Sequence, residues 1–387
     1  MAENYEINIS THNSIYTETN DAPSYGRKAK VYFSIPQKGT DSDTGILLLI
    51  AGFGGHANSN VHKQMREKFA DEYNLVTLQC DYFGFEFMQD LKDISIVDTI
   101  DKLKQGTTEK FSEEIDLIFP SCKFSEDGFI SVANKIDFNL SGNVPLPETK
   151  EYFADMGFLQ AIDNINAVLN VINILYDNNL PFNSRKIIAY GNSQGAYLAY
   201  LCHALSQTIF TMVIDNSAWL YPKYAKNYRS YNAGYNKSKL LFTISYLAKQ
   251  MMDNAENIIF NDEKILDLRY LYSAFENNCK IICYHGTNDA FISGCEKKDF
   301  GKIINDFFYC EISDNEVDGS IFKSSGHGLD ADFKKMFSLV MDKYGVFSKS
   351  NTLNFSDEII FSTEKAEYKI SYKNIYPEIT INQTNTF

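Results

Sequence analysis

The sequence predicts an α/β fold with a mostly parallel central sheet and helices on both faces. Short apolar runs of strand length recur along the chain, and longer segments with apolar residues at helical spacing separate them. Residues 45–51 are apolar without interruption, which is typical of a strand buried on both faces of a parallel sheet. Further strands of this kind are expected at residues 75–80, 186–190, 211–214, 280–284 and 307–312.

The segments between these runs predict the covering helices. Residues 152–176 place apolar side chains such as Ile162, Ile165 and Leu169 on one helical face. Two segments with alternating apolar and polar residues, at 5–10 and 30–35, precede the first buried run and are expected to be strands. The other expected helices cover residues 58–72, 194–205, 297–305 and 330–344.

Two long stretches interrupt this alternation and predict cap-like insertions. Residues 82–148 show no sustained period, so an irregular insertion over one end of the sheet is expected at about 85–148. Residues 218–277 are rich in Tyr and Asn and form a second insertion, with a helix expected near 238–252. The tail from 351 to 382 alternates again and predicts a small C-terminal β-appendage. The expected division is therefore a main domain at 1–345 and an appendage at 346–387.

The composition is that of a globular protein with an acidic surface. Hydrophobic residues make up 44% of the 387 residues, and the formal net charge is −14. This charge argues against binding to nucleic acid or to anionic membrane surfaces, and no apolar run is expected to be long enough to cross a bilayer. The N-terminal residues do not resemble a secretory signal, and the seven cysteines are scattered, so we expect a cytoplasmic protein with reduced thiols.

The most informative motif is Gly191-Asn192-Ser193-Gln194-Gly195, which is G-x-S-x-G. It follows an expected strand and precedes an expected helix, the context in which such a serine is exposed on a tight, strained turn. Small residues on both sides are needed because the turn brings the strand and the helix close together. We therefore expect Ser193 to be a nucleophile, with the N–H of Gln194 facing the developing oxyanion.

A nucleophilic serine needs a base and an acid, which in this type of fold follow it along the chain as acid and then histidine. His327 lies between two glycines in a loop before the last expected helix, and we expect it to be the base. Asp289 follows the strand at 280–284 and is the preferred acid, because its carboxylate would hold the imidazole in the correct tautomer. Asp215, which follows the strand at 211–214, remains the alternative acid.

The oxyanion site requires a second N–H group from the loop after the strand at 45–51. Phe53 is the first choice and Gly54 the second, because the neighbouring glycines let the backbone approach a substrate closely. The aromatic residues of the two insertions are expected to line a pocket for a small-molecule or glycan ester. The candidate substrate-binding residues are Asn192, Trp219 and Tyr82.

Taken in order, these motifs resemble the α/β-hydrolase superfamily over residues 30–345. The resemblance implies the α/β-hydrolase fold and a Ser-His-Asp triad. One departure is Ala51, where many members carry His before the oxyanion glycine. Segments 155–163 and 215–218 also resemble a bacterial family of unknown function associated with flagellin-glycosylation gene clusters, which implies an acylated sugar substrate. The motifs that carry the superfamily resemblance are 52–55, 80–84, 191–195, 285–289 and 326–328.

The predicted function is therefore a serine hydrolase that cleaves an ester or acyl bond, with neither a metal nor another cofactor. No metalloprotease motif, zinc-type cysteine spacing or phosphate loop is present. An acyltransferase with the same triad and a non-catalytic binding protein on this scaffold are alternatives. A dinucleotide-binding oxidoreductase is a third alternative, since Gly52-Phe53-Gly54-Gly55-His56-Ala57 fits G-x-G-x-x-A and Asp81 ends the next strand. The sequence does not predict the oligomeric state.

Overall fold

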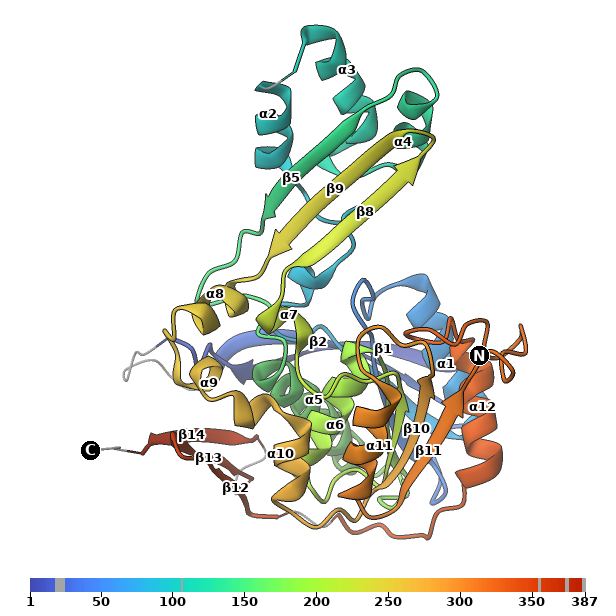
Figure 1. The fold of residues 1–387 in the computed structure, drawn as a ribbon. Coiled ribbons are helices and arrows are strands. Elements are labelled where there is room, and N and C mark those ends of the chain that lie inside the picture. Colours follow the sequence, from blue (N-terminus) through green and yellow to red (C-terminus); the bar gives the residue numbers. More distant parts are fainter. Residues whose placement is uncertain (18–24, 106, 354–355, 373–375, 385–387) are drawn as a thin grey trace.

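The computed structural model describes residues 1–17, 25–105, 107–353, 356–372 and 376–384. Within these residues the centre of the molecule is an eight-stranded sheet with the order β1-β2-β4-β3-β6-β7-β10-β11 (Figure 1). From β4 onward neighbouring strands are parallel, whereas β1, β2 and β4 pair antiparallel. The strands are β1 (Glu3–His12), β2 (Tyr25–Ile35), β3 (Gly45–Ile50), β4 (Leu75–Cys80), β6 (Ile187–Asn192), β7 (Met212–Asn216), β10 (Lys280–Gly286) and β11 (Phe307–Ile312).

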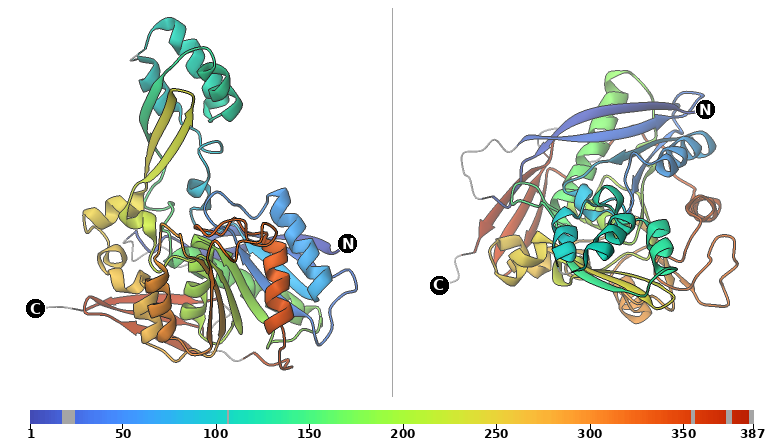
Figure 2. Two further views of the ribbon diagram at one scale, coloured as in Figure 1. Left: turned by 45° about the vertical axis from the view of Figure 1, so that its right-hand side comes forward. Right: turned by 90° about the horizontal axis from the view of Figure 1, so that it is seen from above.

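Helices cover both faces of this sheet, as the alternation of strands and helices predicts (Figure 2). One face carries α1 (Asn60–Tyr73) and α12 (Phe333–Tyr344). The other carries α5 (Phe158–Asp177), α6 (Gln194–Ser206), α10 (Leu268–Ser273) and α11 (Gly294–Lys302). The strand order and the helices on both faces are those of the α/β-hydrolase fold.

The central strands are continuously apolar because each of them packs against a hydrophobic core on both faces of the sheet. Successive side chains of a strand point to opposite faces, so Ile46, Leu48 and Ile50 of β3 pack under α5 and α6. Leu47 and Leu49 of the same strand pack under α1 and α12. All five side chains are less than 5% exposed. The parallel strands therefore form a rigid layer whose carboxyl ends can hold chemical groups in fixed positions.

The two insertions, predicted separately, meet in one cap that rises above the sheet (Figure 1). The first contributes α2 (Val97–Gln105), α3 (Glu109–Ile118), α4 (Glu126–Ala133) and β5 (Asn139–Pro145), and the short helices η1 (Phe85–Met88) and η2 (Pro120–Cys122). The second contributes the hairpin of β8 (Arg229–Tyr235) and β9 (Ser238–Ser245). β5 pairs in parallel with β9, so the described cap contains a three-stranded sheet made from both insertions.

Two local predictions in these insertions are wrong. The segment expected to be irregular at 85–148 contains helices and a strand. The helix expected near 238–252 is instead the strand β9 followed by α8 (Leu247–Asp253). Burial alternates along β9, with Leu240, Phe242 and Ile244 inside and Leu241 exposed, which is the pattern of a strand covered on one face. The remaining short helices at the base of the cap are α7 (Lys223–Lys226), α9 (Ile258–Asn261) and η3 (Glu263–Leu266).

Helix α5 corrects the expectation that no segment is long and apolar enough to cross a membrane. An 18-residue stretch of this 20-residue helix has a mean hydropathy of 1.3, and 83% of that stretch is buried inside the protein. It packs against α6, β1 and β4. A core helix of a large domain satisfies the same length and composition criteria, and this burial accounts for the apolar surface of α5.

Two acidic residues of the segment 155–163, Asp155 and Asp163, have hydrogen-bond or ion-pair partners around the start of α5. Asp155 is fully buried and accepts hydrogen bonds from the hydroxyl of Tyr16 at 2.6 Å and from the N–H of Leu159 at 2.6 Å. Asp163 pairs with the guanidinium of Arg27 at 2.6 Å and accepts the N–H of Phe83 at 2.8 Å. Buried carboxylates persist only when they are paired or hydrogen-bonded, so both residues tie α5 to its neighbours.

The C-terminal segment forms a small antiparallel sheet, β12 (Glu358–Ser362), β13 (Ala366–Ser371) and β14 (Glu378–Gln383), in the described part of the tail. Its inner face, which includes Phe361, Tyr368 and Ile370, belongs to the same hydrophobic core as α5 and α6. The Tyr368 hydroxyl also hydrogen-bonds Asp262 at 3.1 Å. The alternating pattern of the tail therefore reflects one apolar face packed against the main domain.

Glu148 joins the cap to the main domain and should make stability depend on pH. Its carboxylate accepts the N–H of Ala154 at 2.9 Å and the N–H of Leu247 at 2.7 Å, and burial raises its pKa to about 7. The folded state therefore holds a proton here that the unfolded state releases near pH 4.5, so folding stability is lost as the pH rises from about 4.5 to 7. The Tm of Glu148→Gln relative to wild type should rise over that interval, as measured by differential scanning fluorimetry.

Glu151→Gln is the matched control, because Glu151 is exposed in the same segment and its pKa is lowered by hydrogen bonds from backbone N–H and Thr149. This control should show no rise in relative Tm between pH 4.5 and 7. A constant difference between Glu148→Gln and wild type across the interval would contradict the burial of an uncharged carboxyl at the cap base.

Candidate active site

Ser193 lies on a strained turn between β6 and α6, as the G-x-S-x-G motif predicts. Its φ of 54° and ψ of −118° fall in a region that non-glycine residues rarely adopt. A Cβ on Gly191 would lie 2.3 Å from the backbone of Gly195, and one on Gly195 would lie 2.2 Å from the carbonyl oxygen of Ile50. Both glycines are therefore required sterically. The strain places the serine at the edge of the sheet, beside the N-terminus of α6.

The three residues predicted to form a relay lie within hydrogen-bonding distance of one another. Ser193 Oγ is 2.7 Å from His327 Nε2, and His327 Nδ1 is 2.8 Å from Asp289 Oδ2. Each follows a different strand, namely β6, β10 and β11, so the contacts join residues that are far apart in sequence. The His327 side chain is 18% exposed, while that of Asp289 is fully buried. One edge of the His327 imidazole thus faces the serine, and the other faces the carboxylate.

The surroundings of Asp289 keep its carboxyl ionised. Burial alone would raise its pKa, but the hydrogen bond with His327 and the N–H of Phe291 at 2.8 Å lower it, so the pKa lies below its usual value. The Phe291 N–H occupies Oδ1, which leaves Oδ2 for the imidazole. A buried carboxylate fixed in this way requires the proton of His327 on Nδ1 and leaves Nε2 free to accept the hydroxyl proton.

Neither of two other buried histidines takes this place. His285 donates from Nε2 to the carbonyl of Ile292 at 3.0 Å, and its Nδ1 is 3.8 Å from Asp289, beyond hydrogen-bonding distance. Burial and the charge of Lys297 lower the pKa of His285, so it stays neutral. His203 is buried in α6 and contacts Asn277 at 2.8 Å. Both histidines therefore make structural contacts. Their place in the chain agrees with this, because both precede Asp289, whereas the expected base follows the acid.

Asn216, at the end of β7, is a bridging residue that sequence reasoning missed. Its carbonyl accepts the N–H of Ser193 at 2.8 Å, and its side-chain amide donates to the carbonyl of Gly328 at 3.1 Å. It therefore joins the turn at Ser193 directly to the loop of His327. Its position at the carboxyl end of a central strand is the signal that could have identified it.

The acid loop and the histidine loop are also joined directly. The N–H of Asn288 donates to the carbonyl of Ser325 at 2.9 Å, and its side chain donates to the Ser325 hydroxyl at 2.8 Å. A Cβ on Gly286 would lie 2.1 Å from the same carbonyl. The ring of Phe291 lies 4.3 Å from the His327 ring, centre to centre, and covers one side of the imidazole. These contacts hold His327 in one orientation.

Two backbone N–H groups are available for an oxyanion. Those of Phe53 and Gln194 have no hydrogen-bond partner among the described residues, and Gln194 is the first residue of α6, where the helix dipole favours negative charge. Gly54 cannot act as the alternative donor in this conformation, because its N–H already donates to the carbonyl of Met88 at 2.9 Å. Its φ of 82° is part of the turn that makes this bond.

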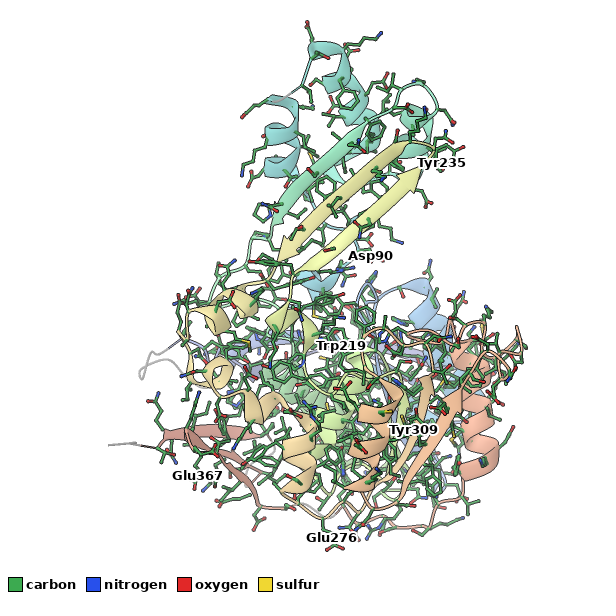
Figure 3. All side chains as sticks on the ribbon, in the orientation of Figure 1. Asp90, Trp219, Tyr235, Glu276, Tyr309 and Glu367 are labelled. Atoms are coloured by element: carbon green, nitrogen blue, oxygen red, sulfur yellow. The ribbon has the colours of Figure 1, made fainter. Side chains whose placement is uncertain are left out.

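The Phe53 ring anchors its loop to the base of the cap. It packs against Trp219 at 5.6 Å and Tyr224 at 4.9 Å between ring centres, and the Arg229 guanidinium lies 5.2 Å above it. Trp219 is only 2% exposed and lies in the body of the molecule beneath the cap (Figure 3). The expectation that Trp219 lines a substrate pocket is therefore not supported, because this ring fills a packed aromatic cluster.

The other two candidate substrate-binding residues differ in position. Tyr82 is 4% exposed, and its hydroxyl lies 3.5 Å from the carbonyl of Ala51, so it packs against the start of the glycine-rich loop after β3. Asn192, directly before Ser193, lines two hollows at the carboxyl ends of the strands. Its Oδ1 atom is buried without a hydrogen-bond partner in the described structure. Of the three candidates, only Asn192 borders space that a ligand can occupy next to Ser193.

Asp215, the alternative acid, belongs to a different buried ion pair. Its Oδ2 lies 2.9 Å from Lys297 Nζ, and both side chains are fully buried. Lys297 also donates to the carbonyl of Ala218 at 2.7 Å, and Oδ1 of Asp215 accepts the Ala218 N–H at 2.6 Å. The carboxylate is satisfied by these partners and by Tyr200 at 2.9 Å. Asp289, and not Asp215, is therefore the acid in contact with His327.

Lys297→Met should destabilise the protein strongly, because it leaves the Asp215 carboxylate buried without its cation. The expected loss in the free energy of unfolding is about 3–5 kcal/mol by urea denaturation. The adjacent Lys298 pairs with Glu311 at the surface, where its side chain is 47% exposed, and Lys298→Met should cost less than about 1 kcal/mol. Equal losses for the two variants would contradict the buried ion pair.

The glycine-rich loop after β3 does not have the geometry of a dinucleotide fingerprint. In that motif the glycines lead directly into a helix whose N-terminus holds the pyrophosphate. Here α1 begins only at Asn60, with Ser59 as its N-cap, and Asp81 accepts a hydrogen bond from Tyr32 at 3.0 Å.

No group of three or more His, Cys, Asp or Glu residues suited to a metal occurs among the described residues.

A family model matches residues 24–379 of the chain, described as "Protein of unknown function (DUF2920)". The chain belongs to this family. The match includes Ser193, Asp289 and His327, so the site described above lies within the DUF2920 region. No curated protein matches the chain.

Solved structures similar to this DUF2920 chain are remote. Est1E from Butyrivibrio proteoclasticus, solved with ferulic acid bound, is 13% identical with a TM-score of 0.38, covering 81% of this chain and 93% of its own. Esterase 2 of Thermogutta terrifontis is 12% identical with a TM-score of 0.43, covering 88% and 97%. The assignment of the fold therefore rests on the strand order and the layers of the chain itself.

Proposed function

We propose that this protein is a serine hydrolase that cleaves carboxylic esters, with Ser193 as nucleophile, His327 as base and Asp289 as acid. The observation that carries the proposal is the continuous relay from Ser193 Oγ to His327 and on to Asp289, at 2.7 and 2.8 Å. A serine hydroxyl is a weak nucleophile unless an adjacent base takes its proton. The orientation of His327 by a buried, ionised carboxylate supplies that base.

The chemistry proceeds in two acyl-transfer steps. His327 accepts the Ser193 proton at Nε2 while Oγ attacks the ester carbonyl, and the oxyanion is held by the N–H groups of Phe53 and Gln194. The imidazolium then protonates the leaving alcohol, and an acyl-enzyme remains on Ser193. A water molecule that gives its proton to His327 attacks this acyl group and releases the acid. Asp289 stabilises the imidazolium in both steps.

The direct test is hydrolysis of p-nitrophenyl butyrate by the purified protein at neutral pH. We expect steady release of p-nitrophenol together with an equal amount of butyrate, and loss of both after treatment with a fluorophosphonate. Quantitative appearance of the butyryl group on an added alcohol such as glycerol, with little free butyrate, would identify an acyltransferase instead. A protein that neither cleaves short esters nor reacts with the fluorophosphonate would be a binding protein on this scaffold.

A further inference from the structure

Two hollows border Asn192, the residue directly before Ser193, and their linings differ in chemical character. The first is a cavity of about 190 Å³ between β3, β4, β6, α1 and the start of α12. Its walls are mostly apolar, formed by Leu49, Met65, Tyr190 and Phe333, and His62 and Gln79 add polar side chains. The second is a crevice of about 370 Å³ with polar walls that include Ser324, His327 and Asp330. Asn192 and Phe333 line both, so both hollows border the residue that directly precedes Ser193.

The reaction geometry assigns a role to each hollow. At the tetrahedral carbon, one substituent is Ser193 Oγ and another is the oxyanion facing the N–H groups of Phe53 and Gln194. A third is the leaving oxygen, which must face His327 because this residue protonates it. The acyl substituent takes the remaining direction. The polar crevice is lined by His327, whereas the apolar cavity is lined by the oxyanion-loop residues Gly52 and Phe53 and does not include His327.

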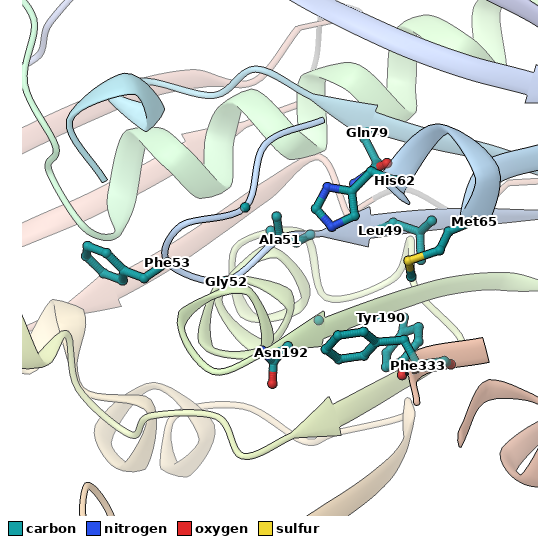
Figure 4. Close-up of a pocket in the computed structure, with 13 residues that line it drawn as sticks. Leu49, Ala51, Gly52, Phe53, His62, Met65, Gln79, Tyr190, Asn192 and Phe333 are labelled. Carbon is teal, nitrogen blue, oxygen red and sulfur yellow. Dashed lines mark hydrogen bonds between the residues drawn. The ribbon is translucent and has the colours of Figure 1, made fainter. Parts of the chain in front are cut away.

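On the basis of the proposed ester hydrolysis, we propose that the apolar cavity is the acyl subsite and that it selects esters of a compact apolar acid with a polar alcohol. Figure 4 shows Met65, Leu49, Tyr190 and Phe333 grouped on one side of Gly52 and Asn192, with the Phe53 ring turned away on the other side. An apolar cavity of about 150 Å³ is large enough to bind benzene. A cavity of about 190 Å³ therefore suits a short aliphatic or single-ring acyl group.

The walls of the cavity are rigid, so its volume should limit the size of the acyl group that it can hold. Leu49 and Tyr190 belong to central strands and are less than 5% exposed, and the Tyr190 hydroxyl donates to the carbonyl of Phe333 at 3.2 Å. Met65 enters from α1, is 5% exposed and is the most adaptable wall residue because its side chain is unbranched. Met65 is thus the position at which the length of the cavity can be changed with least disturbance of the sheet.

The test compares kcat/KM for p-nitrophenyl esters of different acids in wild type and in Met65 variants. In wild type, kcat/KM should rise roughly four-fold for each methylene from acetyl to butyryl, accept benzoyl, and collapse for dodecanoyl. Met65→Trp fills the cavity and should lower kcat/KM for benzoyl and butyryl esters by about ten-fold or more relative to the acetyl ester. Met65→Ala should shift the optimum toward longer acyl groups.

Val61→Ala is the control on the same helix, because Val61 is 62% exposed and does not line the cavity. It should retain the wild-type acyl profile. If Ser193 reacts with a fluorophosphonate and acetyl esters are cleaved, but neither Met65 variant changes the acyl profile, the acyl-subsite assignment is wrong and the proposed function stands. If no ester is cleaved and Ser193 does not react, both fail together.

Discussion

Ser193→Ala should abolish ester hydrolysis while the protein remains folded. The variant removes the atom that forms the acyl-enzyme, and loss of such a nucleophile costs about 10⁶-fold in kcat in serine hydrolases of this mechanism. The Ser193 side chain is hydrogen-bonded to His327 and not to the core, so thermal unfolding should stay close to that of wild type. The measurement is kcat for p-nitrophenyl butyrate, together with a melting curve by circular dichroism.

Ser206→Ala provides a matched control for this variant. Ser206 ends the same helix, and its buried hydroxyl donates to the carbonyl of Cys202 at 2.6 Å. This substitution removes one buried hydroxyl without touching the relay, so kcat should remain near the wild-type value. Wild-type turnover in Ser193→Ala would refute the mechanism, whatever the behaviour of the control.

Asp289→Asn should lower kcat by about 10⁴-fold through the tautomer of His327. At present Oδ1 accepts the N–H groups of Phe291 and Ile292, and Oδ2 faces His327 Nδ1. An amide at this position keeps its oxygen toward those N–H groups and presents its NH₂ to Nδ1. The imidazole proton then moves to Nε2, which can no longer accept the Ser193 proton. KM should change little, because Asp289 is buried behind His327.

The corresponding control is Asp299→Asn, an equally conservative change on α11. Asp299 is 71% exposed and pairs with Lys302 at the surface, so its substitution should leave kcat and Tm within experimental error. If Asp289→Asn lowered kcat by only ten-fold or less while the protein stayed folded, the buried carboxylate would have a structural role and would not orient His327.

The central sheet and the relay were predictable because their signals are local. Continuous apolar runs mark strands buried on both faces, and β3 and β6 appear where those runs lie. The glycines on both sides of Ser193 are required for a steric reason that holds for any such turn. A Cβ added to either would lie 2.2 to 2.3 Å from a backbone atom. The order of Ser193, Asp289 and His327 along the chain then placed each at the end of a parallel strand, where the loops converge.

The sequence predicts a helix where the cap has strand β9, because the apolar residues there fit the period of a helix as well as that of a strand. Leu240, Ile244, Leu247 and Met251 are spaced as on one face of a helix. Burial nevertheless alternates along Ser238–Ser245, and the extended residue Tyr246 separates this strand from α8. Its partner strand β5 lies about a hundred residues earlier in the sequence and pairs in parallel. No local sequence pattern indicates a strand pairing over that separation, so the sequence alone predicts two insertions and not one cap.

The details of the oxyanion loop also depend on distant contacts. Gly54 was a reasonable donor by its position, but its N–H is taken by Met88 from the next insertion. Trp219 was expected in a pocket wall because aromatic residues suit both cores and pockets. Its burial against Phe53 follows from the tertiary arrangement. The apolar cavity beside Asn192 is likewise assembled from β3, β4, β6, α1 and α12.

The most direct test of the account is to map the site of reaction with a fluorophosphonate. The folded protein is treated with the probe at neutral pH, digested and sequenced by tandem mass spectrometry. We expect one equivalent of adduct on Ser193, formed at a rate that falls sharply in His327→Ala. Failure of Ser193 to react, or an adduct on another residue while Ser193 stays unmodified, would contradict an activated nucleophile at this position.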